Sequence, residues 1–284
     1  MTTSPAPSEP PADVRHFARV LCAIDGSRGG AEAVREALTL CDPAGVVRFV
    51  AVTDVRGTGP TRMASVGEYR AGQALAAARA LATDRGVRAE IELAHDDDVA
   101  GALLARAAGY DLLALGSHRE SRLGGIATGS TATAIAHRAE GPVLVARPAA
   151  AGAPPFPSHV VVALADDRDG STLVETAGAL AAQHGAHVHL VCVAEHALGQ
   201  AEHHRIAWLS ARLREMTGVE PLVSTPPGVP HEAIADVARH DGASLVVVGR
   251  RGLSGVRALG SVSERVVHTA PCSVLVLPTP ARPE

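Results

Sequence analysis

Short apolar runs rich in β-branched residues alternate along the chain with longer Ala-, Leu- and Arg-rich stretches of helical period. This alternation predicts a parallel β-sheet with helices packed against it. In the first half of the chain, strands are expected near 19–24, 46–53, 87–94, 111–116 and 142–147. The helices of that half are expected near 30–40, 66–85, 98–108 and 129–138. In the second half, strands are expected near 159–165, 186–194, 218–224, 244–249 and 273–278.

The two halves of the chain repeat each other. RVLCAIDGS at 19–27 aligns with HVVVALADD at 159–167, and VLV at 143–145 recurs at 274–276. The strand runs are almost continuously apolar, as expected when helices cover both faces of a sheet. We therefore expect two tandem doubly wound (Rossmann-like) α/β domains, each with a five-stranded parallel sheet and helices on both faces.

The domain boundaries follow from the repeat and from local composition. A polar, Pro-rich start at 1–17 predicts a disordered tail, and 18–148 forms the first domain. A Pro-, Ala- and Gly-rich linker at 149–157 leads to the second domain at 158–280. A length of 284 residues suits two domains of ordinary size.

Composition narrows the classes of function. Hydrophobic residues make up 46% of the chain and charged residues 20%, which predicts a globular protein. The net charge of -4 and the low aromatic content of 2% argue against a nucleic-acid partner. All 26 basic residues are arginine, so the chain has no lysine for a Schiff base or for a P-loop. Any phosphate must be held by backbone N–H groups, hydroxyls or arginine.

Other features of the chain point to a cytoplasmic protein without a membrane anchor. The start of the chain lacks a basic segment followed by an apolar run, so no signal peptide is expected. No stretch approaches the roughly 20 apolar residues of a membrane helix. The four cysteines include no CxxC pair, and Cys22 and Cys192 lie in apolar runs, which predicts buried free thiols.

Candidate chemistry lies where the first and fourth strands end, because open parallel sheets bind ligands beyond the carboxyl ends of their strands. The first strand ends in Asp25, Gly26 and Ser27. Glycine lets a backbone approach a phosphate closely, and the start of a helix favours an anion. The fourth strand and the helix after it supply residues of this kind, namely Gly116, Ser117, His118, Arg119, Gly129, Ser130 and Thr131.

These residues resemble the universal stress protein family, in particular its tandem two-domain members. The resemblance covers 19–278, and its most specific element is the pattern G-x-x-G-x9-G-[ST] after the fourth strand, together with the strand-end Asp25. It implies that the protein binds ATP, with or without Mg²⁺, with Asp25 and nearby backbone holding adenosine and the loop and helix start holding the phosphates. It also implies that the VLV strands pair the two domains within the chain, and it leaves a homodimer and further protein partners open.

The resemblance marks a set of nucleotide-binding residues in each half. In the first half these are Ala23, Ile24, Asp25, Gly26, Ser27, Val52, Gly116, Ser117, His118, Arg119, Gly129, Ser130 and Thr131. In the second half they are Gly249, Gly252, Gly260 and Ser261.

Both halves depart from the family pattern. Arg119 replaces the second glycine of the first half, where it either clashes with a bound phosphate or contacts it with its charge. In the second half the loop between Gly252 and Gly260 is two residues shorter than its counterpart, and Ala165 aligns with Asp25. We therefore expect the first half to bind nucleotide and the second half to be weakened or structural.

Each candidate residue also has a structural interpretation. Asp25 suits a turn, and Ser27 is favoured as the N-cap of the following helix. Gly116 and Gly129 can allow tight packing of a helix against a strand.

Histidines and acidic clusters are expected to be structural, and no metal site is predicted. His196, His203 and His204 suit a solvated polar face, because adjacent helical residues point to different sides. In the run His95-Asp96-Asp97-Asp98, capping of the next helix by Asp97 or Asp98 is favoured. His137 and His268 recur near the end of the last helix of each half, where a positive charge is favourable.

The sequence therefore favours an ATP-binding stress-response regulator that works through nucleotide-dependent conformation and partner binding. It is not expected to be an enzyme, beyond slow incidental ATP hydrolysis, because no lysine or activated nucleophile is evident. The alternative is a nucleotide-free interaction module that works through dimerisation. A third possibility, an adenylylating enzyme of the ATP-pyrophosphatase type, has an SGGxDS loop where this chain has IDGSRGG at 24–30.

Overall fold

The computed structural model describes residues 17–53, 64–117, 130–150, 152–165, 170–193, 198–250 and 262–278. The strands in these ranges are β1 (Phe17–Ala23), β2 (Cys41–Thr53), β3 (Arg88–His95), β4 (Leu112–Gly116), β5 (Val143–Ala146), β6 (His159–Leu164), β7 (His187–Cys192), β8 (Leu222–Ser224), β9 (Leu245–Arg250) and β10 (Ser273–Pro278). The helices are α1 (Arg28–Leu40), α2 (Ala64–Asp84), α3 (Val99–Ala107), α4 (Ser130–Arg138), α5 (Ser171–His184), α6 (Gln200–Thr217), α7 (Pro230–His240) and α8 (Val262–Thr269).

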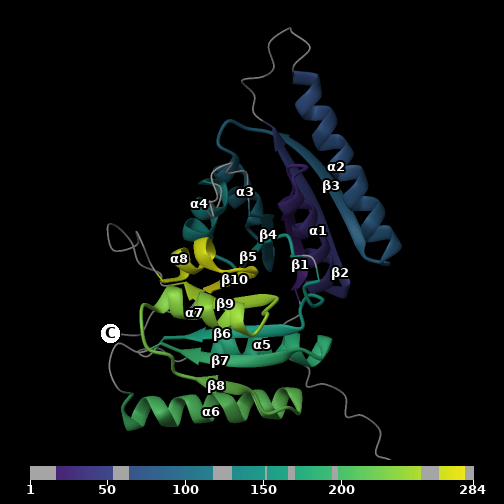
Figure 1. Ribbon diagram of the computed structural model, residues 1–284. Coiled ribbons are helices and arrows are strands. Elements are labelled where there is room, and N and C mark those ends of the chain that lie inside the picture. Colours follow the sequence, from purple (N-terminus) through teal and green to yellow (C-terminus); the bar gives the residue numbers. More distant parts are fainter. Residues whose placement is uncertain are drawn as a thin grey trace, which may run out of the picture.

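The ten strands form one continuous sheet in the order β3-β2-β1-β4-β5-β10-β9-β6-β7-β8. Within each half all neighbouring strands are parallel, and the chain order reverses between β1 and β4 and again between β6 and β9. Figure 1 shows the first half above and the second half below, with β5 and β10 between them. The predicted fold class is confirmed.

One antiparallel pair joins the two halves. Leu144 of β5 lies opposite Leu275 of β10, and both side chains are fully buried. The predicted pairing of the two VLV strands is therefore correct. We call this pair of strands the joint.

Helices cover both faces of the sheet and bury two apolar cores. One core contains residues of α1, α2, α5 and α6, and the other contains residues of α3, α4, α7 and α8. Both cores extend across the two halves, because each includes residues from strands of both repeats. Apolar burial on both faces explains the nearly continuous apolar strand sequences.

Two strand boundaries differ from the prediction. β2 begins at Cys41 and not near 46, because Phe17 pairs with Cys41 before an irregularity shifts the register. β8 begins only at Leu222, because Gly218 adopts a φ of 70° and ends α6 in a left-handed conformation that no strand allows.

Several local predictions can be compared with the structure. The side chain of Asp98 caps α3 by accepting a hydrogen bond from the backbone N–H of Gly101, as predicted. All four cysteines lie within the described residues and none of them forms a disulfide bond, and burial raises the pKa of the Cys22 thiol. His203 donates to the carbonyl of Gly199 at 2.8 Å, whereas His196 lies outside the described residues. His137 and His268 lie in the last turns of α4 and α8.

In the described part of the chain, no group of three or more His, Cys, Asp or Glu side chains is arranged to hold a metal ion. None of the helices found there combines the length and the apolar character needed to cross a membrane.

Candidate functional site

The ends of β1, β2 and β4 and the starts of α3 and α4 surround a cavity of about 280 Å³ in the first half. We call it the strand-end cavity. It lies at the point where the strand order reverses, which is the expected place for a ligand in an open α/β sheet. Its walls are formed by Ala23, Ile24, Asp25, Val50, Val52, Val99, Leu103, Leu115, Gly116, Thr131 and Ala132.

Six of the predicted nucleotide-binding residues line this cavity. They come from four separate segments of the chain, and they are Ala23, Ile24, Asp25, Val52, Gly116 and Thr131. Asp25 is the acidic residue among the lining residues, and Thr131 brings a hydroxyl from the first turn of α4. The cavity therefore combines apolar walls with a carboxylate on one side and a helix start on the other.

The turn after β1 fixes the position of Asp25. Its Oδ1 accepts a hydrogen bond from the backbone N–H of Ser27 at 2.9 Å, and Gly26 between them has a φ of 75°. Ser27 Oγ in turn accepts from the backbone N–H of Gly30 at 3.0 Å and caps α1, as predicted. The turn interpretation of Asp25 is thus correct, and the same turn holds the carboxylate at the edge of the cavity.

Gly116 allows β4 and the start of α1 to touch. A Cβ atom on Gly116 would lie 2.2 Å from the carbonyl carbon of Gly29 and 2.4 Å from the nitrogen of Gly30. A Cβ atom on Gly29 would in turn lie 2.6 Å from the carbonyl oxygen of Ser117. This close approach supports the packing interpretation of Gly116, and it sets the distance between Asp25 and the end of β4.

Ser117 follows β4 but does not line the strand-end cavity. Its backbone N–H donates to the carbonyl of Ala146 at 2.8 Å, and the residue is 2% exposed. Its Oγ is buried and has no hydrogen-bond partner among the described residues.

The rest of the predicted loop is only partly described. Ser130 is the first residue of α4, and His118, Arg119 and Gly129 lie outside the described residues. The two interpretations of Arg119 therefore stay open.

The second half differs at the end of its first strand. Ala165 occupies the position equivalent to Asp25, and its carbonyl accepts a hydrogen bond from the guanidinium of Arg205 at 2.9 Å. Gly249 lies in β9 opposite Leu277, whereas Gly252, Gly260 and Ser261 lie outside the described residues. An arginine from α6 thus contacts the backbone where the first half has a carboxylate.

Most of the apolar wall of the cavity was not predicted from the sequence. Ala23, Ile24 and Val52 were named, whereas five further apolar residues line it: Val50, Val99, Leu103, Leu115 and Ala132. The signal was present in part, because Val50 and Val52 are two residues apart and so share one face of β2. The contributions of α3 and α4 depend on tertiary packing and have no local pattern.

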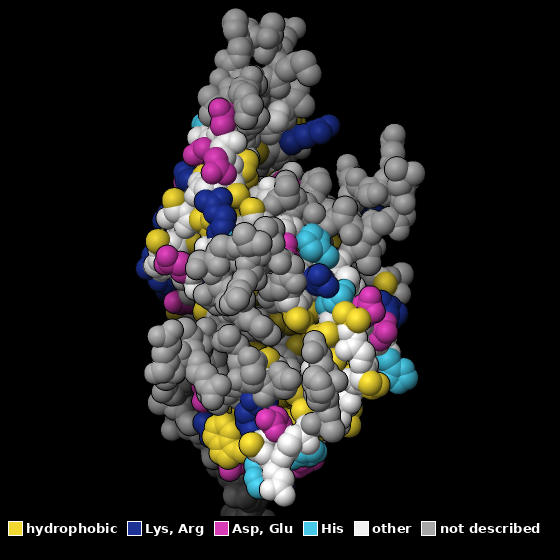
Figure 2. Space-filling model, turned by 90° about the vertical axis from the view of Figure 1, so that its left-hand side faces the viewer, with side chains coloured by type: hydrophobic (Ala, Val, Ile, Leu, Met, Phe, Trp, Pro, Cys, Tyr) yellow, Lys and Arg dark blue, Asp and Glu magenta, His cyan; other side chains and the backbone are white. Residues whose placement is uncertain are grey.

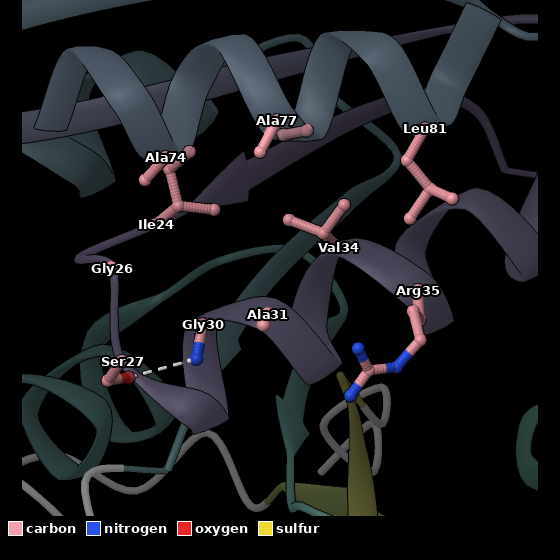
Figure 3. Close-up of a pocket in the computed structure, with 11 residues that line it drawn as sticks. Ile24, Gly26, Ser27, Gly30, Ala31, Val34, Arg35, Ala74, Ala77 and Leu81 are labelled. Carbon is pink, nitrogen blue, oxygen red and sulfur yellow. Dashed lines mark hydrogen bonds between the residues drawn. The ribbon is translucent and has the colours of Figure 1, made fainter. Parts of the chain in front are cut away.

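A second cavity, of about 340 Å³, lies between α1 and α2, on the opposite face of the sheet. Figure 3 shows Ala74, Ala77 and Leu81 of α2 facing Ile24 and Val34 across this gap. We call this second cavity the groove. The predicted residues Gly26 and Ser27 line the groove and not the strand-end cavity, whereas Ile24 lines both.

The small side chains of Ala74, Ala77 and Ala78 of α2 line one side of the groove. The buried positions Ala71, Leu75 and Ala78 of α2 have the same spacing as Ile206, Ser210 and Leu213 of α6. In the second half, Leu213 and Met216 of α6 reach close to Gly178 of α5, so the two helices are in contact at that point.

Replacing Ala78 with leucine is expected to stabilise the protein by about 1 kcal/mol, because the added carbon atoms enter existing space. Urea unfolding followed by circular dichroism measures this change. The matched control is Leu213→Ala at the equivalent position of α6, which removes a fully buried side chain and should destabilise by about 2–5 kcal/mol. A loss of stability in Ala78→Leu would mean that the groove cannot accept a larger side chain.

The described surface has no large area of one charge on the face shown in Figure 2. Arginine, acidic and histidine side chains are interspersed there with hydrophobic ones. This distribution is unlike the continuous basic stripe of a nucleic-acid-binding face.

Comparisons with known proteins agree with the fold. The family model for the universal stress protein family matches residues 16–147 and 157–278. A universal stress protein of Synechocystis is 50% identical over 52 residues, which are 18% of this chain and 34% of that protein. One of Methanocaldococcus jannaschii is 37% identical over 73 residues, which are 25% of this chain and 43% of that protein. These matches span less than half of the length of either relative.

A solved structure extends the likeness to almost the whole chain. The crystal structure of a universal stress protein from Archaeoglobus fulgidus matches with a TM-score of 0.74 at 21% identity. The match covers 93% of this chain and 99% of that one, and at this identity it demonstrates a shared fold. Since the family model matches both halves, the chain belongs to the universal stress protein family, with two family domains in tandem.

Proposed function

We propose that the protein binds ATP in the strand-end cavity of its first half and acts as a stress-response regulator. The observation that carries this proposal is the gathering of Asp25, Val52, Gly116 and Thr131 around one cavity at the switch point of the sheet. The volume of about 280 Å³ is close to the lower limit of ordinary ligand pockets and suits the nucleoside part of the molecule.

The lining of the cavity fits the parts of a nucleotide. The valine and leucine side chains offer an apolar surface for the flat base. The Asp25 carboxylate is a hydrogen-bond acceptor for ribose hydroxyls, held in place by the turn to Ser27. The nine-residue helix α4 begins at Ser130, and its first N–H groups favour the negative charge of phosphates.

Regulation is a better fit than catalysis for this site. Without lysine, the phosphates depend on backbone N–H groups, hydroxyls and arginine, and the described lining offers no side chain suited to drive phosphoryl transfer. Mg²⁺ would be carried by the nucleotide, since this ion takes most of its ligands from phosphates and water. Nucleotide binding would act by changing the surface offered to partner proteins.

In this proposal the second half binds nucleotide more weakly than the first half. Alanine replaces the strand-end aspartate there, and Arg205 already binds the carbonyl of Ala165. We therefore propose one functional nucleotide site per chain.

Calorimetric titration of nucleotide-stripped protein with ATP and Mg²⁺ is expected to give one site per chain. Asp25→Asn should weaken binding about tenfold, because a charge-assisted hydrogen bond to the ribose becomes a neutral one. The control Asp84→Asn removes a carboxylate at the exposed end of α2 and should leave the affinity unchanged.

The result of this titration distinguishes an ATP-binding regulator from a nucleotide-free interaction module. Failure to bind ATP at millimolar concentration would favour a nucleotide-free interaction module that works through dimerisation. Equal affinity in wild type and Asp25→Asn would move the site away from the strand-end cavity.

A further inference from the structure

Three polar side chains of the second half form a hydrogen-bonded line at the edge of the sheet. His189 Nδ1 lies 2.6 Å from Asp241 Oδ2, and His189 Nε2 lies 2.7 Å from Ser224 Oγ. We call Ser224, His189 and Asp241 the relay. It belongs to the second half and shares no residue with the strand-end cavity of the first.

The hydrogen bonds define what each member of the relay can do. An ionised carboxylate only accepts hydrogen bonds, so the proton of the neutral imidazole lies on Nδ1 and points to Asp241. The lone pair on Nε2 then faces Ser224 and accepts its hydroxyl proton. This is the tautomer in which histidine acts as a general base toward serine, with the carboxylate orienting the ring.

Three different elements bring the relay together. In the register of β7 and β8, His189 lies opposite Leu222 and Val191 lies opposite Ser224. Residues two apart share one face of a strand, so His189 and Ser224 lie on the same face of neighbouring strands. Asp241 follows α7 directly, and its backbone N–H donates to the carbonyl of Val237, which fixes it beside β7.

The relay is shielded but reachable. The side chains of His189 and Asp241 are 14% and 18% exposed, and Ser224 is half-buried. In the described part of the chain β8 is the last strand of the sheet, and an edge strand presents backbone N–H groups that no neighbouring strand takes up. Leu222 lies on the same face as Ser224 and is 65% exposed, so it provides an apolar surface beside the serine.

We propose that Ser224 is a nucleophile that accepts acyl groups from small esters with short apolar acyl chains, with His189 as the general base and Asp241 as the positioning residue. Ser224 Oγ forms a bond to the ester carbonyl carbon while its proton passes to His189 Nε2. The tetrahedral intermediate then expels the alcohol, which takes that proton as the ester C–O bond breaks. Water releases the acyl group by the same two proton transfers, and the serine is restored.

No activated nucleophile is evident in the sequence, and the spacing of the relay explains why. Ser224 is 35 positions from His189, and Asp241 is 52 positions from it. No local motif links them, and only the sheet register and the end of α7 bring them together. A purely structural role would use the same contacts to tie the edge strand to α7, so the test must measure reactivity as well as stability.

Diisopropyl fluorophosphate is the first probe, because it phosphorylates activated serines with loss of fluoride. Intact-protein mass spectrometry and peptide mapping of the full chain are expected to show one adduct, on Ser224. Ser224→Ala should abolish it, and His189→Gln should slow it about 100-fold, the size of a general-base contribution. The control Ser171→Ala, which changes a half-buried serine outside the relay, should leave the labelling rate unchanged.

The positioning role of Asp241 is tested by the conservative variant. Asp241→Asn should slow both labelling and the hydrolysis of 4-nitrophenyl butyrate, and Asp241→Glu should restore part of the rate. Unfolding midpoints measured in parallel separate lost reactivity from lost structure. The proposal is overturned if Ser224 stays unlabelled, if several serines react at similar rates, or if folded His189→Gln and Asp241→Asn proteins react as fast as wild type.

Discussion

Replacing Gly116 with alanine is expected to destabilise the protein by about 3 kcal/mol or more. The new Cβ would lie 2.2 Å from the carbonyl carbon of Gly29, and the atoms it meets belong to the backbone of α1. Backbone atoms cannot rotate away from a contact as the end of a side chain can, so α1 must move away from β4 or the strand must bend. The same shift would displace Asp25, so we expect nucleotide binding to be lost together with stability.

Urea unfolding of wild type and Gly116→Ala measures this effect. The matched control is Gly72→Ala, because Gly72 is an exposed position of α2 with no atom within 4 Å of the added Cβ. There alanine should stabilise slightly, by about 0.5–1 kcal/mol, through its higher helix propensity. A Gly116→Ala protein as stable as this control would show that β4 and α1 are not in rigid contact.

The buried carboxyl of Glu36 is expected to make the protein less stable as the pH rises. Glu36 lies in α1 and is 3% exposed, and its Oε1 accepts a hydrogen bond from Ser273 Oγ at 2.6 Å. Its Oε2 has no hydrogen-bond partner among the described residues. Ser273 Oγ also accepts from the backbone N–H of Arg147, so this chain of contacts crosses between the halves beside the joint. Burial, the largest cause, raises the pKa of Glu36 well above its usual range.

The direction of the effect follows from the protons bound by each state. Above the unfolded pKa of about 4.3, the unfolded chain loses the Glu36 proton while the folded protein keeps it. Unfolding then releases a proton, so stability falls as the pH rises from that value through the raised folded pKa. For one whole proton the slope is about 1.4 kcal/mol per pH unit.

Glu36→Gln is expected to remove this dependence while keeping an oxygen for Ser273. Denaturant unfolding at a series of pH values should therefore show that the free energy of unfolding of the variant rises relative to that of wild type as the pH increases. Glu140→Gln, at an exposed site, is the control for a general effect of losing a negative charge. If wild type and Glu36→Gln gave parallel stability curves, the carboxyl would not be held protonated by the fold.

Most of the fold could be predicted from the sequence, because the signals were local or repeated. Apolar strand runs and helical periods marked the elements, and the recurrence of VLV at 143–145 and 274–276 predicted the joint. The two boundary errors came from tertiary and backbone effects. The pairing of Phe17 with Cys41 lengthened β2, and the left-handed Gly218 shortened β8.

The candidate site could be predicted only in part. Asp25 and Gly116 were identified because the ends of neighbouring parallel strands must meet at one edge of the sheet. The walls supplied by α3 and the groove between α1 and α2 depend on how helices pack, and no spacing along the chain encodes them. The relay had no sequence signal, since His189, Ser224 and Asp241 meet only after β7, β8 and α7 are in place.

The joint makes the pairing of the two halves independent of protein concentration. If β5 and β10 belonged to separate subunits, dilution would pull them apart by mass action, and subunits could be exchanged between molecules. Here both strands belong to one chain, so each encounters the other at the high effective concentration set by the connecting segment. The two halves therefore stay paired in a fixed ratio at any expression level, and mixed pairs with other family members cannot form through this edge while the joint is closed.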